Sequence, residues 1–502
     1  MRTFVAFALG AAVGIFAFPA GMALTGSSLA ATLIAGGAAI VVGLWTYRRP
    51  IVPLDEPTSR GLKIVSAVAT VVALVQLARL AVFTVAPSEV GYSFIPGSDW
   101  EVHHSCFSAY YVAARASSST SNIYADSLYT RSDDDPTGPR KARVIGPFKI
   151  DVFEYPPPFL LLPRALRLLT PDFLRSRMVW FALDGGLVLL ALLIVARLLS
   201  PTAGRRALLL SPLVWAALPT ISTLQKGNAQ AMVIAASMLA MVLFERRRWA
   251  AGGAVLAFVT VSKLYPGLLV FYLIARRQWR AAAWTAAFGI AFVVLTGLDI
   301  GWATYAAFLD HLPGLVGGEA FPAFRNPAAT AINFSVPGLV FKLKLFGVPG
   351  MNFGAAKVVG WCYTLVAVAV TILVGRRALR DQEKPLVWLA ILIVATLRSP
   401  FLPQAYAAFP PLWLLTLLAA GASSNAWRLS SLLAAWSALN VFWPLDWAID
   451  PRVLAIATLV PQAVTIGIAA LVLQRAFAPQ IPGLSSAAAR SDRGLSTAAS
   501  PC

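Results

Sequence analysis

The sequence predicts an all-α integral membrane protein, a polytopic bundle of about 12–14 transmembrane helices with an outer loop that contains amphipathic surface helices. Of its 502 residues 58% are hydrophobic and 13% are charged, whereas a soluble domain carries about a quarter charged residues. Apolar segments of membrane-crossing length recur along most of the chain. The basic residues fall in short clusters between these segments, which fits membrane loops better than a nucleic-acid-binding surface.

The predicted helices are the apolar segments that approach the length of about 20 residues needed to cross a bilayer core. The first resembles a signal peptide, but a second apolar segment follows closely, so we expect a retained helix. Two others are too short to span alone and are either half-helices or one helix kinked at Pro266. The segments lie near residues 4–23, 29–47, 64–86, 178–199, 206–222, 229–245, 250–262, 265–276, 280–298, 356–375, 384–398, 403–421, 428–446 and 452–474.

The sidedness follows from the basic clusters, because Lys and Arg collect in cytoplasmic loops. With both termini cytoplasmic in a plasma (inner) membrane, one alternation of sides places every cluster inside. The clusters are Arg48, Arg49, Arg60 and Lys63; Arg205 and Arg206; Arg246, Arg247 and Arg248; Arg276, Arg277 and Arg280; Arg376, Arg377 and Arg380; and Arg428. The predicted extracytoplasmic stretches are the large loop 87–177, the segment 301–355 and the turn 399–403.

Three regions are expected along the chain. Residues 1–63 hold two additional helices and a basic loop, residues 64–475 form the catalytic membrane domain, and residues 476–502 are a disordered tail. No internal repeat is evident, which weakens the case for a transporter built from duplicated halves. The three cysteines Cys106, Cys362 and Cys502 lie far apart and predict neither a disulfide framework nor a zinc site.

The large outer loop opens with a carboxylate, Asp99, just beyond a predicted helix. At the membrane surface it is placed to accept a proton from a sugar hydroxyl during glycosyl transfer. The alternative is that Asp99 caps a helix beginning near Trp100. His103 and His104 are either accessory groups or solvated side chains. No third ligand completes a metal site with them, so none is predicted.

Two further parts of this loop carry recognisable patterns. The prolines that follow Phe153, Glu154 and Tyr155 predict an amphipathic helix on the membrane surface. Arg164 and Arg167 are available there to lipid phosphates, although simple anchoring is equally compatible. The run 133–135, three aspartates among Ser, Thr, Gly and Pro, predicts a solvated loop.

Cations and amides gather at the predicted outer ends of helices, where ionisable groups commonly mark a functional cavity. A sugar phosphodiester needs cations for the phosphate and a carboxylate to deprotonate the acceptor. Among these cations we interpret Lys226 as an interfacial residue whose side chain extends to the membrane surface. The sites are Gln225, Lys226 and Asn228; Lys263, where two short apolar segments meet; and Arg398.

The segment 301–355 offers possible accessory residues from the second half of the chain. They are Asp310 and His311, with Arg325 and Asn326 further along, and they are placed to close over the same cavity. Lys342 and Lys344 interrupt the apolar run 328–346, which therefore predicts a surface helix.

Taken in order, these residues resemble the membrane mannosyltransferase-like proteins of glycosyltransferase family 87, whose fold is similar to the wider GT-C class. Each motif is weak alone, but six in sequence cover most of residues 99–400. The motifs are Asp99; Tyr110-Tyr111 with Asn122-Ile123-Tyr124; Phe153 through Pro157; Gln225 to Asn228; Lys263 to Pro266; and Ser399-Pro400. Two features depart from the family pattern: the two additional N-terminal helices, and Pro403 through Tyr406, which lack an aromatic-His character.

The resemblance implies inverting transfer of a hexose, typically mannose, from a polyprenyl-phosphate carrier to a lipid or glycan acceptor. Asp99 would be the base, and Lys263 and Arg398 would bind the donor phosphate. Contacts with the sugar or lipid would come from Gln225, Asn228 and Tyr155. No metal or separate cofactor is implied, since the polyprenyl-phosphate sugar is itself the donor.

Two alternatives remain at this stage. A transporter or flippase for a lipid-linked sugar would need similar outer cations, but it predicts charges deep within several helices. A polymerase or ligase of lipid-linked glycans differs mainly in how many sugars the donor carries.

Overall fold

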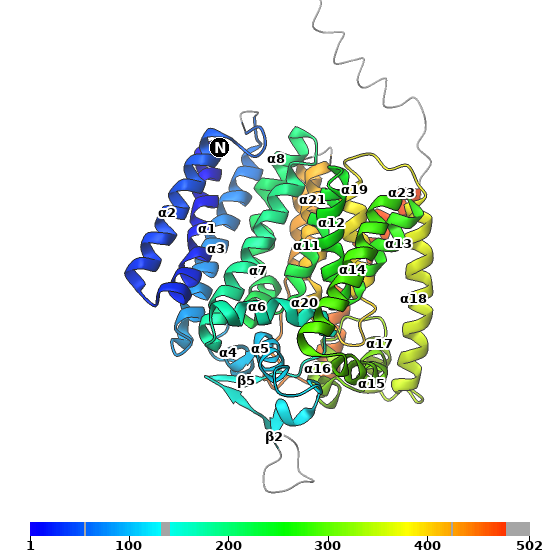
Figure 1. The fold of residues 1–502 in the computed structure, drawn as a ribbon. Helices are drawn as coiled ribbons and strands as arrows, with labels where there is room; N and C mark the ends of the chain where they lie inside the picture. Colours follow the sequence, from blue (N-terminus) through cyan, green and yellow to red (C-terminus); the bar gives the residue numbers. More distant parts are fainter. Residues whose placement is uncertain (55–56, 132–140, 423–424, 478–502) are drawn as a thin grey trace, which may run out of the picture.

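The computed structural model describes residues 1–54, 57–131, 141–422 and 425–477, and they form a bundle of helices (Figure 1). Among these residues seven helices are long and apolar enough to cross a membrane. This confirms the predicted all-α membrane class. The seven are α1 (Arg2–Thr25), α2 (Ser28–Arg48), α3 (Arg60–Val85), α7 (Phe173–Ala196), α14 (Trp279–Ile300), α18 (Phe353–Gly375) and α23 (Pro451–Phe477).

The remaining predicted spans are shorter or broken helices. The segment 206–222 is bent by 65° between α9 and α10, where Pro219 opens the second helix. α11 has 16 residues and therefore a length of about 24 Å, less than a bilayer core of about 30 Å. These helices are α8 (Pro201–Leu210), α9 (Pro212–Trp215), α10 (Leu218–Lys226), α11 (Gln230–Glu245), α12 (Trp249–Lys263), α13 (Leu268–Ala275), α19 (Lys384–Thr396), α20 (Gln404–Ala407), α21 (Phe409–Gly421) and α22 (Asn425–Leu439).

The predicted interruption of the apolar hairpin at Lys263 is present. α12 ends at Lys263, Leu264 has a left-handed φ of 56°, and a 3₁₀ turn, η4 (Tyr265–Gly267), leads into α13. A positive φ is uncommon for a residue with a side chain and often marks a functional turn. The break fixes the ammonium group of Lys263 at the end of a buried helix.

Short elements cover one end of the bundle, which we call the loop face (Figure 1, lower end). β1 runs parallel to β5, with His104 opposite Lys149, and β4 pairs antiparallel with β5. β2 (Thr130–Arg131) and β3 (Lys141–Ala142) form a second, antiparallel pair. The loop-face elements are α4 (Asp99–His103), β1 (His104–Ser105), α5 (Cys106–Ala116), β4 (Val144–Ile145), β5 (Phe148–Ile150), η3 (Pro157–Leu160), α6 (Leu161–Leu169), α15 (Ala303–Gly317), α16 (Pro327–Ala331) and α17 (Gly338–Leu345).

The predicted inner loops meet at the opposite end, where Figure 1 also places the N-terminus. Arg276 donates a hydrogen bond of 2.8 Å to the carbonyl oxygen of Arg377. Arg206 donates one of 3.3 Å to the carbonyl oxygen of Ala422. Basic loops far apart in the sequence therefore lie side by side, as one alternation of sides requires.

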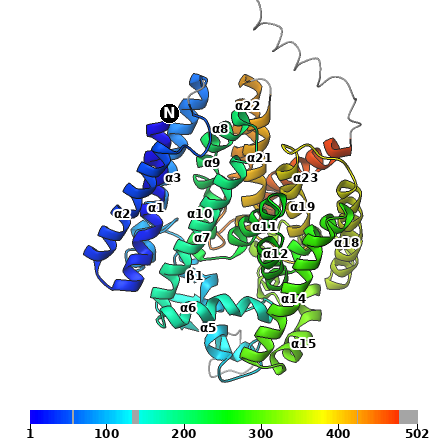
Figure 2. The same cartoon turned by 45° about the horizontal axis from the view of Figure 1, so that its top comes forward.

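The two additional N-terminal helices pack as a close pair at one edge of the bundle (Figure 2). A methyl group on Gly10 of α1 would lie 2.6 Å from the carbonyl oxygen of Ala39 in α2. Small residues that allow such close approach are typical of helix pairs in membranes. α1 also packs against α7, while most of α2 faces outward.

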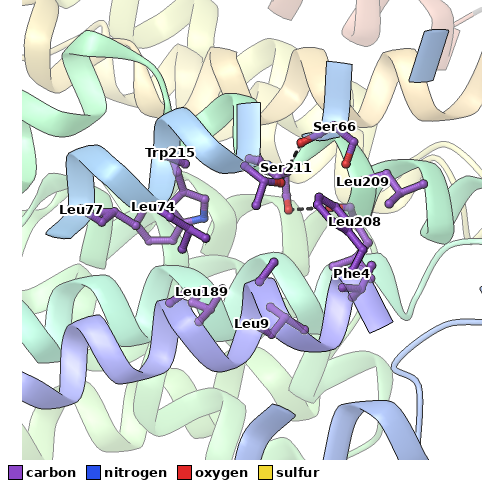
Figure 3. Close-up of a pocket in the computed structure, with 16 residues that line it drawn as sticks. Phe4, Leu9, Ser66, Leu74, Leu77, Leu189, Leu208, Leu209, Ser211 and Trp215 are labelled. Carbon is purple, nitrogen blue, oxygen red and sulfur yellow. Dashed lines mark hydrogen bonds between the residues drawn. The ribbon is translucent and has the colours of Figure 1, made fainter. Parts of the chain in front are cut away.

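A small apolar cavity of about 60 Å³ lies between α1, α3, α7 and α8 (Figure 3). Its lining includes Leu9, Leu74, Leu189 and Trp215. None of the described residues around it is ionisable, so it offers no group for acid–base chemistry.

The structure corrects two predictions about basic side chains near the surface. α6 is amphipathic as expected, with Leu168 exposed. Its arginines, however, bind protein groups rather than lying free for lipid phosphates. Arg164 forms an ion pair of 2.7 Å with Asp299, and Arg167 donates to the carbonyl oxygen of Ala114 at 3.0 Å.

The second correction concerns the run 328–346, which forms two short helices, α16 and α17, instead of one surface helix. Lys342 is buried and donates hydrogen bonds to Thr458 at 2.9 Å and to Gln462 at 3.2 Å. Two partners on α23 compensate the amine for its lost water. The predicted acidic loop at 133–135 and residues 478–502 of the predicted tail lie outside the described residues.

Candidate functional site

A buried ion pair connects the short helix α4 with the end of α10. The Lys226 ammonium lies 2.6 Å from a carboxylate oxygen of Glu101, and Ser222 donates to the other oxygen at 3.0 Å. Glu101 is 1% exposed and Lys226 is 3% exposed. The prediction that Lys226 snorkels to the interface is therefore wrong, because its charge is neutralised inside the protein by a carboxylate.

Asp99 points the other way, out of the same short helix. Ser98 is the N-cap of α4 and accepts from the Glu101 amide at 3.1 Å, so the predicted capping role of Asp99 belongs to its neighbour. Asp99 instead bonds Lys149 at 2.6 Å and His103 at 2.8 Å, with 60% of its side chain exposed. The hydrogen bond from Lys149 lowers the pKa of Asp99, which keeps the carboxylate ionised.

Both the oxygen and the nitrogen of the Gln225 side-chain amide form hydrogen bonds within the loop face. Its oxygen accepts from the amide of Phe94 at 2.5 Å, and its nitrogen donates to the carbonyl oxygen of Glu101 at 2.6 Å. The chain then reverses at Gly227, whose φ of 65° is left-handed. The Gln225 side chain thus holds Phe94 and Glu101 in place, and its expected contact with the sugar or lipid stays a prediction.

The centre of the loop face is a cluster around the Cys106 thiol. Tyr406 lies 3.0 Å from the sulfur, Asn228 donates to it at 3.3 Å, and the Nε2 of His104 lies 3.6 Å away. The same His104 nitrogen is 3.6 Å from a carboxylate oxygen of Asp151. The β1–β5 pairing explains the arrangement, because it sets His104 beside Lys149, two residues before Asp151.

Burial dominates the electrostatics of this cluster. It lowers the pKa of His104 to about 3 and raises the pKa of Cys106 to about 12. Partial desolvation by the surrounding protein also raises the pKa of Asp151, whose side chain is half-buried, to about 6. At neutral pH the imidazole is therefore neutral and the thiol protonated, while Asp151 is largely ionised.

An aromatic wall adjoins the cluster and joins two of the predicted motifs. The Tyr155 hydroxyl lies 2.8 Å from that of Tyr110, and its ring stacks on Phe159 with centroids 4.6 Å apart. The Lys263 ammonium lies 5.0 Å from the centre of the Tyr155 ring, a cation–π distance. It is also within electrostatic reach of Cys106. The Lys-x-x-Pro and Tyr-Pro-Pro motifs thus meet beside Cys106.

The segment 301–355 reaches the same wall from the other half of the chain. The His311 ring stacks on Tyr124 at 4.9 Å, and the Tyr124 hydroxyl donates to the carbonyl oxygen of Tyr155 at 2.8 Å. Asp310 is exposed on α15. Of the predicted accessory pair, His311 is the member that contacts the wall.

Arg398 has different neighbours. It bonds the Thr364 hydroxyl at 2.6 Å, and its guanidinium lies 5.6 Å from the centre of the Trp361 ring. Both partners are in α18, so these contacts connect Arg398 with that helix rather than with the cluster around Cys106.

Sequence reasoning missed four residues of this site: Glu101, Cys106, Asp151 and Tyr406. Glu101 and Asp99 are equivalent in the sequence pattern, and only the folded helix shows which is buried. Tyr406 lies 300 residues from Cys106. The sequence could have identified Asp151, because it lies two residues before the aromatic-Tyr-Pro-Pro motif that begins at Phe153.

Comparison with known families gives one match. A family model described as glycosyltransferase family 87 matches residues 153–403. This range holds Tyr155, Lys226, Asn228 and Lys263, while Asp99, His104, Cys106 and Asp151 precede it and Tyr406 follows it. No curated protein and no solved structure matches the chain.

Proposed function

The chain belongs to glycosyltransferase family 87, and on that premise we propose that it transfers a mannosyl or similar hexosyl residue from a polyprenyl-phosphate carrier. The acceptor is a lipid or glycan at the extracytoplasmic face, on which we place the loop face. The observation that carries the proposal is the convergence of Asp99, Lys263 and Tyr155 on one end of a membrane bundle.

The proposed reaction is a single displacement with inversion at the anomeric carbon. Asp99 accepts the proton of the acceptor hydroxyl, whose oxygen forms a bond to the sugar. The bond between the sugar and the phosphate oxygen breaks, and the polyprenyl phosphate leaves with the electron pair. An exposed, ionised carboxylate such as Asp99 suits the first step.

The cations of the site act on the phosphate. Lys263 is held over Tyr155 by the break after α12, where a desolvated ammonium stabilises negative charge on a leaving group. Arg398 is proposed as a second phosphate ligand from the α18 side. The aromatic wall offers Tyr155 as a face for the apolar side of the sugar, and Asn228 offers its amide.

The base has one competitor, a carboxylate that directly follows β5. Asp151 lies two residues after Lys149, the partner of Asp99, and burial raises its pKa to about 6, closer to the value of an efficient base. Transfer by an Asp99→Asn variant at an unchanged rate would assign the proton transfer to Asp151 instead.

The class of reaction is tested with purified protein in liposomes and radiolabelled polyprenyl-phosphate-mannose beside a total lipid extract. The proposal predicts label in a new lipid or glycan. Label in products that carry many sugars would indicate a polymerase or ligase.

A transporter is the second candidate, and one observation favours it. Asp184, in the middle of α7, is buried, and Lys263 is within its electrostatic reach. An ionisable residue at this depth is typical of transport pathways. Movement of the labelled carrier across the liposome membrane without transfer would establish transport and contradict the enzyme.

A further inference from the structure

We propose that His104, Cys106 and Asp151 bind one divalent transition-metal ion of the zinc type beside the proposed reaction site. The sequence predicts no such site, because the three residues are not spaced as a metal motif. The parallel pairing of β1 with β5 brings them together, and their three ligand atoms lie within 4.8 Å of one another.

Two distances in the cluster match the separation of ligands around one ion, and the His104–Asp151 distance is too long for a direct hydrogen bond. The His104 nitrogen lies 3.6 Å from the Cys106 sulfur and 3.6 Å from the Asp151 oxygen. An N–H···O hydrogen bond is about 2.7–3.2 Å long. Around a tetrahedral zinc ion, with bonds of about 2.0–2.3 Å, neighbouring ligand atoms are about 3.3–3.6 Å apart.

The donor set identifies the kind of metal. A thiolate, an imidazole and a carboxylate suit a borderline-soft ion such as Zn²⁺ or Co²⁺, whereas Mg²⁺ and Ca²⁺ prefer oxygen ligands alone. The neutral imidazole is the form that binds a metal, and His104 offers its Nε2 atom to the cluster. Binding releases the thiol proton of Cys106 to solvent, since a coordinated thiol is deprotonated by the charge of the ion.

Side chains around Cys106 offer hydrogen bonds that would stabilise a thiolate at its sulfur. Asn228 donates a hydrogen bond to the Cys106 sulfur, and the Tyr406 hydroxyl lies within hydrogen-bonding distance on another side. Such outer partners orient metal ligands and tune their charge. Lys226, a buried cation close enough to interact electrostatically with His104 and Cys106, is paired with Glu101, so its charge opposes an incoming cation less than a free ammonium would.

Three protein ligands leave a coordination position open. His104 and Cys106 are buried, but 38% of the Asp151 side chain is exposed, so the ion is reachable from that side. Zinc sites with three protein ligands and one open position are typical of catalytic centres. If the proposed function holds, a donor phosphate oxygen or the acceptor hydroxyl takes this position; metal binding itself does not depend on that function.

The test uses the full-length protein in detergent, loaded with Zn²⁺ or Co²⁺ and freed of excess metal by gel filtration. We expect one ion per chain by elemental analysis, and a sulfur-to-cobalt charge-transfer band in the absorption spectrum. Cys106→Ser should remove the band and weaken binding by more than about 100-fold, beyond the 10–100-fold effect of losing an outer partner. The matched control is Cys362→Ser, which removes an exposed cysteine of α18 and should retain both signals.

Absence of metal from the wild type after loading would overturn the proposal, as would equal binding by Cys106→Ser. If Cys106→Ser fails to fold, the wild-type cobalt spectrum and an Asp151→Asn variant decide the question. The metal-binding assay contains neither sugar donor nor acceptor, so its result does not depend on the proposed function. A protein that binds one ion but transfers no sugar in the separate transfer assay would refute the proposed function and leave this inference intact.

Discussion

At the scale of single residues, Asp99 and Glu101 show how one helical turn separates two carboxylates. Residues two apart on a helix point to nearly opposite sides. Asp99 therefore faces solvent and Lys149, while Glu101 faces the interior and Lys226. One is accessible to a substrate, and the other holds the loop face on the bundle.

The buried pair gives a prediction about stability. Glu101→Gln leaves the Lys226 ammonium uncompensated and should destabilise the protein by about 3–5 kcal/mol. The double variant Glu101→Gln/Lys226→Met should recover much of that loss, because both charges are gone. Thermal unfolding in detergent measures both effects, and a single variant as stable as the wild type would show that the pair is not structurally important.

A second prediction concerns the donor phosphate. Lys263→Ala should raise KM for the polyprenyl-phosphate sugar by roughly 10–100-fold, the range of one lost charge-assisted hydrogen bond. Lys357→Ala is the control, since Lys357 forms a half-exposed ion pair with Glu319. Initial rates over a range of donor concentrations give KM. An unchanged KM for Lys263→Ala would remove this lysine from the donor site.

At the scale of elements, the positions of the helices are largely predictable from the sequence and the contacts of the loop face are not. Apolar length identifies spans such as α7 and α14, and the polar break at Lys263 identifies the end of α12. The cluster around Cys106, however, depends on β1 and β5, strands of two and three residues. Such short strands carry no usable periodicity, and their partners are set by the surrounding fold.

The contact of α1 with α7 yields a prediction with an internal control. A methyl group on Gly185 of α7 would lie 2.1 Å from the Phe16 ring, whereas one on Gly186 meets nothing within 4 Å. Gly185→Ala should cost about 1–3 kcal/mol through overpacking. Gly186→Ala should be neutral or stabilising, because alanine favours the helix. Unfolding midpoints compare the two, and equal midpoints would contradict this packing.

At the scale of the whole molecule, the long apolar helices differ in position from the short helices that carry residues of the candidate site. The long apolar helices lie mainly toward the edges, as α2 and α18 do in Figures 1 and 2. The short helices α10, α11 and α12 bring their polar ends together beneath the loop face. The sequence predicts short helices only at 250–262 and 265–276. The composition of a segment shows how apolar it is, but it does not show at which residues the neighbouring helices end.

The central claim is that Asp99 is the base of glycosyl transfer on the loop face, and Asp99→Asn tests it most directly. The measurement is the rate of label transfer from polyprenyl-phosphate-mannose, beside donor binding and beside Asp381→Asn, which changes an exposed carboxylate before α19. The account predicts a loss of about 10²–10⁴-fold for Asp99→Asn, with donor binding and folding retained. Transfer at the wild-type rate by Asp99→Asn would contradict it.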